Sequence, residues 1–178
     1  DRVEGNLPAA NQAIQKLALL YPDGELAAAQ IEAAVLNVAR YDVFKLGGAV
    51  LSGQLLRAQR MLDGLQAEGE SEVMVHYTLA EDIRALKRVR EALDAGRPMP
   101  VALREQRIWG PRERLFERAL PQLTDAVLTE LLHAAHLVDG IAKGIPAAGW
   151  PATGWQALHQ LALNLATACS TGKTRLAV

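Results

Sequence analysis

The chain has 178 residues and a formal net charge of -1; half of its residues are apolar and 22% are charged. This composition excludes an acidic or basic tail and a generally basic nucleic-acid-binding protein. Because it contains 31 alanines and 28 leucines but only 4% aromatic residues, the chain is predicted to be all-α. No apolar stretch approaches the roughly 18 residues that span a bilayer, so a cytoplasmic protein without membrane contact is predicted.

The first 40 residues are predicted to contain two helices. Asn6 can cap the first, whose apolar residues recur at helical spacing up to a Tyr-Pro-Asp-Gly turn at 21–24. The second extends from about 26 to 38, and the pattern stops at 40–42, where we expect a domain boundary. Because the chain starts at Asp1 and runs directly into a helical pattern, we expect a fragment of a longer polypeptide.

A second group of helices is predicted beyond this boundary. Residues 43–51 form an apolar helix, and a break at Ser52 separates it from an amphipathic helix that ends at 68–70. The longest helix is predicted from Ser71 to a glycine- and proline-containing loop at 96–100. Its buried stripe is expected to contain Tyr77, Ala80, Ile83, Leu86, Val89 and Leu93.

The C-terminal half continues the helical pattern. A short helix near 102–105 is followed by a Trp-Gly-Pro turn at 109–111 and by a helix that starts at Pro111. Thr124 is expected to cap the next helix. The last helix is expected to bury Leu158, Leu161, Ala162, Leu165 and Cys169. The short connections predict an antiparallel all-α bundle.

The sequence carries no convincing catalytic, metal or cofactor motif. The run from Ser170 to Thr174 resembles the end of a phosphate-binding loop, but Thr167 stands where the motif requires glycine, and a helix precedes it instead of a strand. His133 and His136 have a spacing that suits a metal, but no acidic residue completes a recognisable ligand motif with them. We therefore predict no catalytic residue, no metal and no cofactor.

The most suggestive local feature is a basic segment around Trp109. Residues 84–118 contain ten Lys or Arg and five Asp or Glu, in contrast to the acidic residues 1–83. Arginines neutralise phosphates and an indole can stack on an unpaired base, so the segment is a candidate contact for single-stranded DNA. The alternative is that the indole closes the end of the bundle while the arginines pair with neighbouring glutamates. The candidate DNA-binding residues are Arg107, Trp109, Arg112 and Arg114.

Several short motifs occur in the order found in one known family. They are Val3 to Leu7, Ile14 to Leu20, the run from Leu51 through Arg57-Ala58 to Glu70, Arg107-Ile108-Trp109, and Asp139 to Gly144. In this order they resemble the delta subunit of the bacterial DNA polymerase III clamp loader. The resemblance implies that residues 1–40 are the end of a small helical AAA+ lid domain. Residues 43–178 would then be the C-terminal helical collar, which is the oligomerisation domain.

The resemblance also implies a non-catalytic role in DNA replication. The collar would assemble with the other loader subunits, gamma/tau and delta-prime, and the Trp109 segment would lie where single-stranded template leaves the loader. The sliding clamp would be contacted only through an N-terminal domain that this sequence lacks. The wide apolar stripes of the last two helices suggest a second face for neighbouring subunits. The interface candidates are Leu128, Leu132, Leu158, Leu161 and Leu165.

Two other classes of protein remain open at this point. A ligand-binding or dimerising helical domain of a bacterial regulator would have a similar composition, although no convincing recognition-helix pair is seen in the first 50 residues. A small helical enzyme would require a cluster of polar groups assembled inside the bundle.

Overall fold

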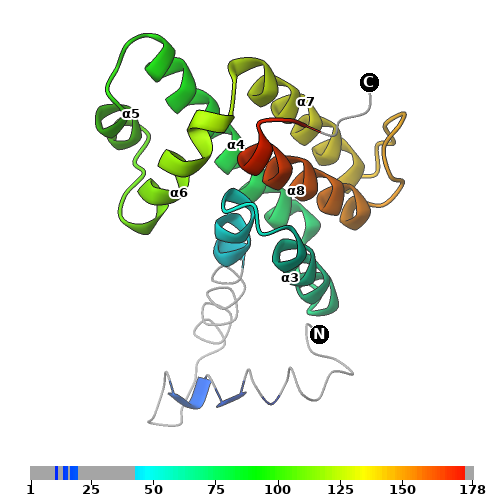
Figure 1. Cartoon of the computed structure of the whole chain (residues 1–178). Coiled ribbons are helices and arrows are strands. Elements are labelled where there is room, and N and C mark those ends of the chain that lie inside the picture. Colours follow the sequence, from blue (N-terminus) through cyan, green and yellow to red (C-terminus); the bar gives the residue numbers. More distant parts are fainter. Residues whose placement is uncertain (1–10, 12–13, 16, 20–42, 175–178) are drawn as a thin grey trace.

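The helices of the computed structural model follow the apolar pattern of the sequence (Figure 1). The structure describes residues 11, 14–15, 17–19 and 43–174, and within this part of the chain it contains helices and no strand. The predicted lid portion, residues 1–40, therefore lies almost wholly outside the described residues. Within residues 43–174, the helical residues 43–51 come first. They are followed by α3 (Leu55–Ala67), α4 (Glu72–Asp94), α5 (Met99–Glu105), α6 (Pro111–Ala119), a 3-10 turn (Leu120–Gln122), α7 (Asp125–Ala142) and α8 (Gly154–Thr171).

Local signals explain several of these boundaries. The Thr124 hydroxyl accepts a hydrogen bond from the Val127 backbone N–H at 3.3 Å, as predicted for the start of α7. Thr153 caps α8 in the same way through Gln156. At the other end of α8, Gly172 adopts φ +70° and closes the helix, because glycine enters the left-handed region without a steric cost. The Ser170–Thr174 run is thus a helix end, which agrees with the rejection of a phosphate-binding loop.

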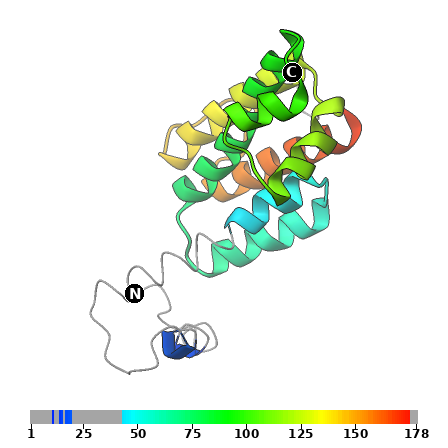
Figure 2. The same ribbon diagram turned by 90° about the vertical axis from the view of Figure 1, so that its left-hand side faces the viewer.

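The bundle is organised around α8. This helix packs against α7, α3 and α4, and in Figure 2 its orange-to-red ribbon lies between the cyan helices on one side and the green and yellow helices on the other. Leucines and alanines of all these elements form one continuous core. Cys169 belongs to this core, and burial raises the pKa of its thiol to about 12. Trp150 and Trp155 are partly buried against the core.

Four of the five leucines predicted as interface residues do not lie on an exposed face, because the chain buries them in its own core. Leu128, Leu158, Leu161 and Leu165 each have 0% exposure. The stripes of α7 and α8 are wide because these helices meet several neighbours, and the apolar residues on both sides of each stripe are used within the fold. Only Leu132 retains some exposed surface, at the edge of the core.

The buried face of α4 also differs from the prediction. Tyr77 is 58% exposed, whereas His76 and Asp82 are buried at 5% and 3% exposure. Four of the six predicted residues, Ala80, Ile83, Leu86 and Val89, are buried, and Leu93 is partly buried against the core. The buried face also includes Val75 and Leu79, so the prediction is wrong at Tyr77 alone. Helical spacing places Tyr77 in register with this face but does not show whether a neighbouring helix covers its side chain.

Candidate nucleic-acid interface at the Trp109 turn

The connection between α5 and α6 is a tight reversal that begins with a helix cap. The Arg107 N–H donates to the Arg104 carbonyl, and the Ile108 N–H donates to the Leu103 carbonyl, both at 3.0 Å. These two bonds form a Schellman motif, in which the residue at the Arg107 position adopts a left-handed conformation. Arg107 indeed has φ +55°, and it is the only residue other than glycine with a positive φ in the described part of the chain. Arginine therefore occupies a position at which glycine is usual.

The second half of the turn starts α6. Gly110 has φ 59° and ψ -129°, a conformation that side chains disfavour, and Pro111 then occupies the first helical position, where its missing N–H costs nothing. Between these two backbone reversals lie Ile108 and Trp109. Ile108 is 3% exposed and anchors the turn in the core, whereas Trp109 is 58% exposed. The indole therefore does not close the end of the bundle, because Ile108 fills that position.

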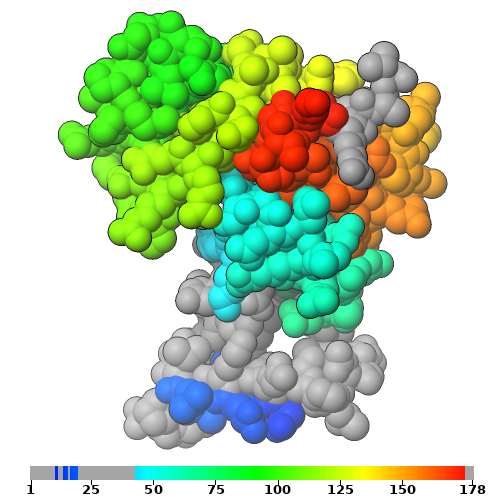
Figure 3. Space-filling model, viewed as in Figure 1, coloured from blue at the N-terminus to red at the C-terminus, as the bar shows by residue number. Residues whose placement is uncertain are grey.

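The turn projects from one end of the molecule. Figure 3 shows α5 and α6, in green to yellow-green, forming a lobe beside the rest of the bundle. Arg104, Arg107 and Arg114 are exposed on this lobe, and none of them has an ion pair with a residue that the structure describes. Elsewhere in the basic segment, two arginines do pair with nearby glutamates: Arg84 with Glu81 and Arg97 with Glu105.

Arg112 differs from the other arginines of the segment. Its Nη2 lies 2.5 Å from Oδ1 of Asp82, a side chain 4% exposed, on α4, and its guanidinium also stands over the Phe116 ring at 5.7 Å. Burial raises the pKa of Asp82 from 3.8 to about 6, and the Arg112 charge opposes this effect. The four predicted DNA-binding residues are therefore brought together on one turn. Arg107, Trp109 and Arg114 have exposed side chains. Arg112 is instead paired with the buried carboxylate of Asp82.

Sequence reasoning missed Asp82. The signal was present, because an aspartate at this position interrupts the spacing of Leu79, Leu86 and Val89, which all lie on the buried face of α4. A charged residue within an apolar helix stripe indicates a buried partner elsewhere in the chain. The sequence alone does not reveal that the partner is Arg112, thirty residues further on.

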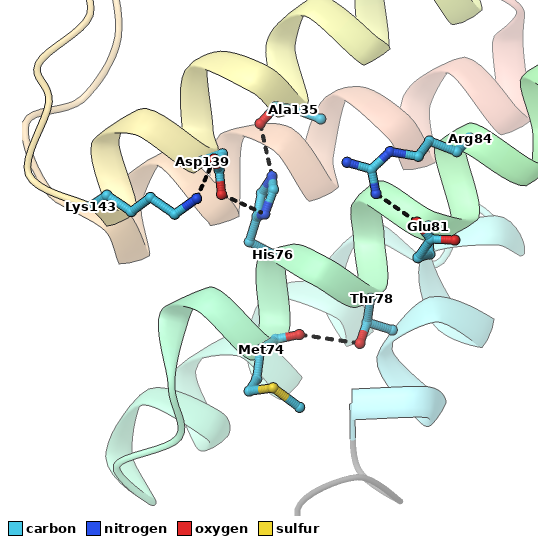
Figure 4. A network of polar contacts seen from close by, with 8 residues as sticks. All are labelled: Met74, His76, Thr78, Glu81, Arg84, Ala135, Asp139 and Lys143. Carbon is cyan, nitrogen blue, oxygen red and sulfur yellow. Dashed lines mark hydrogen bonds and ion pairs between the residues drawn. The ribbon is translucent and has the colours of Figure 1, made fainter.

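A second polar cluster lies between α4 and α7 (Figure 4). The His76 Nε2–H donates to the Ala135 carbonyl at 2.8 Å, and its Nδ1 lies 3.6 Å from Asp139 Oδ1. Lys143 binds the other oxygen of Asp139 at 2.6 Å and lowers the pKa of that carboxyl. Burial lowers the pKa of His76. These groups line a cleft of about 370 Å³ together with Tyr77 and other residues.

The cleft contains one of the two histidines whose spacing had suggested a metal site. His136 lines it, but His133 is a separate exposed residue of α7. The described part of the chain contains no group of three His, Cys, Asp or Glu side chains suited to a metal ion. None of the described helices is long and apolar enough to cross a membrane.

Fold and surface together define a class of protein: an all-helical domain whose most distinctive exposed feature is a basic turn around an indole. No family model matches the chain. It is 33% identical over 135 residues to DNA polymerase III subunit delta of Escherichia coli. The matched region covers 76% of this chain and 38% of that protein. It is 30% identical over 148 residues to the same subunit of Haemophilus influenzae, with 79% of this chain and 43% of that protein covered.

These matches confirm the resemblance to the delta subunits of DNA polymerase III that the ordered motifs indicated. The chain spans about two fifths of the length of these relatives. Neither relative supports the alternative of a bacterial regulator domain.

Proposed function

We propose that the chain is the C-terminal helical part of a DNA polymerase III delta subunit, in which it acts as a non-catalytic assembly module of the clamp loader in the cytoplasm. The observation that carries this proposal is the similarity to two delta subunits over three quarters of the chain. The all-helical bundle agrees with a collar domain comprising residues 43–178. Its partners would be the gamma/tau and delta-prime subunits, and the sliding clamp would be reached only through the domain that precedes this segment.

The first test is assembly. In size-exclusion chromatography with light scattering, the chain mixed with gamma/tau and delta-prime is expected to elute as a defined hetero-oligomer. Elution of the chain as a separate homodimer would contradict the proposal. Leu132 is the one interface candidate that retains exposed surface, so Leu132→Gln is expected to weaken assembly. Leu56→Gln is the matched control, because Leu56 is a leucine on α3 that is 70% exposed.

We further propose that the Trp109 turn contacts single-stranded template DNA. Three observations support this role: the indole is 58% exposed, free arginines surround it, and Arg107 holds a strained conformation. A left-handed backbone costs a non-glycine residue about 1 kcal/mol. An arginine at such a position therefore indicates that its charge has a use.

Trp109→Ala is expected to weaken the binding of a single-stranded oligonucleotide by about 1 to 3 kcal/mol, because one base loses its stacking partner. Arg114→Ala is expected to reduce the slope of log K against log salt by about 0.7, the value for one phosphate contact on a single strand. Fluorescence anisotropy at several salt concentrations measures both effects. Wild-type affinity in Trp109→Ala together with an unchanged slope in Arg114→Ala would exclude this contact.

A further inference from the structure

Asp82 is an ionisable group placed in the core of the bundle. Its exposure is 3%, and the only other polar residues buried in the described part of the chain are His76 and Asn164. Removing a carboxylate from water costs free energy that only a good partner offsets. An apolar residue at this point of the α4 stripe would pack without that cost. The group that Asp82 binds therefore has to explain why an aspartate occupies this position.

The partner of Asp82 lies just after the Trp109 turn, where α6 begins. Arg112 is the second residue of α6, and its Nη2 is 2.5 Å from Asp82 Oδ1. The other oxygen faces the helical residues 43–51, where a Cβ added at Gly47 would lie 2.5 Å from Asp82 Oδ2. A glycine at this position therefore leaves room for the carboxylate.

Other contacts hold the turn at its α5 end and in the core. Arg88 of α4 donates a hydrogen bond to the Gln106 side chain at 2.6 Å, Ile108 is the apolar residue buried within the turn, and Phe116 anchors α6 one turn further along. α6 has only nine residues, so the orientation of its first turn depends strongly on a contact at that end. The ion pair between Arg112 and Asp82 supplies this contact and ties the first turn of α6 to the long helix α4.

We propose that Asp82 is a positioning residue for the Trp109 turn, which it orients through Arg112. For nucleic-acid binding, this inference rests on the proposed contact of Trp109 with DNA. It assigns Arg112 a different role from Arg107 and Arg114: its charge is matched by Asp82 and orients the turn, whereas theirs are available to phosphates. Besides Arg112 of α6, the titratable groups near Asp82 are Glu81 of its own helix and Cys169 of α8.

The experiment uses the full chain labelled with 5-fluorotryptophan. The ¹⁹F resonance of Trp109 is assigned by its loss in Trp109→Ala and is followed from about pH 5 to 8. In the wild type it is expected to move with the protonation of Asp82 near pH 6. In Asp82→Asn it is expected not to move in this interval. Asp94→Asn is the matched control, because Asp94 is on the same helix and pairs with Arg90 at 2.5 Å on the surface.

Oligonucleotide affinity is measured on the same proteins. Asp82→Asn is expected to bind about tenfold more weakly, which corresponds to the loss of one charged contact. When Trp109→Ala is already present, Asp82→Asn is expected to have almost no further effect, because Asp82 acts through the indole. Arg112→Lys keeps a cation near Asp82 and is expected to restore part of the affinity that Arg112→Ala loses.

The two proposals fail in different ways. Loss of affinity in Trp109→Ala with wild-type affinity in folded Asp82→Asn would overturn the positioning role and leave the DNA contact standing. Wild-type affinity in Trp109→Ala would overturn the DNA contact, and the ¹⁹F resonance would then decide the positioning role by itself. A Trp109 resonance with the same pH profile in the wild type and in Asp82→Asn would refute positioning. If Asp82→Asn does not fold, two other results decide the positioning role. They are the movement of the wild-type Trp109 resonance near pH 6 and the recovery of affinity in Arg112→Lys relative to Arg112→Ala.

Discussion

Leu161→Ala is expected to lower the free energy of unfolding of the isolated chain by about 2 to 5 kcal/mol, the usual cost of removing a buried leucine side chain. Leu161 has 0% exposure in α8, the helix that contacts α3, α4 and α7. Truncation there leaves a cavity that several helices would have to close together. Urea unfolding followed by circular dichroism measures the change, and an unchanged dependence on urea concentration shows that the native fold is retained.

Leu163→Ala is the matched control for this experiment. Leu163 lies on the same helix but is only partly buried, so its truncation is expected to cost clearly less. The comparison distinguishes a core leucine from an interface leucine. An isolated chain with wild-type stability after Leu161→Ala, combined with weaker assembly, would show that Leu161 faces a partner, as the sequence had suggested.

The stability of the chain is expected to depend on pH through Asp82, with a sign opposite to that of most carboxylates. Burial raises the pKa of Asp82 from 3.8 to about 6, so between these values the folded chain holds a proton that the unfolded chain has released. The stabilisation is complete below pH 3.8 and is lost as the pH rises through about 6. The pKa change corresponds to about 3 kcal/mol.

The contribution of Asp82 is isolated by subtracting the unfolding free energy of Asp82→Asn from that of the wild type at each pH. This difference is expected to fall by about 2.4 kcal/mol between pH 4 and 7. The subtraction is needed because His76 acts in the opposite sense: burial lowers its pKa below 6.5, so the fold loses stability as the pH falls below that value. A difference that stays constant over the whole interval would contradict the prediction.

The fold was largely predictable, and the burial of individual side chains was not. Residues 55–67 and 125–142 form helices where the apolar spacing predicted them, and Thr124 caps the second of these as expected. The error at Tyr77 arose because helical spacing does not show whether a neighbouring helix covers a side chain. Packing against α7 and α8 buries Leu79 and Leu86 and leaves Tyr77 exposed.

The candidate site was predictable only in part. The charge pattern and the Trp-Gly-Pro turn located the segment around Trp109, and the structure confirms that the indole is exposed. Sequence did not separate Arg112 from Arg107 and Arg114, because an arginine has the same charge whether it faces water or a carboxylate thirty residues away in the sequence.

The sequence by itself determined the all-helical class, the positions of the turns and the basic segment, because these depend on local propensity and on neighbours in the chain. The tertiary structure decided which apolar residues are core, since burial depends on how many helices meet at a residue. It buried Leu128, Leu158, Leu161 and Leu165 and left Leu132 at the edge. It also decided the pairing of Asp82 with Arg112, because an ion pair between distant residues forms only where packing brings two helices together.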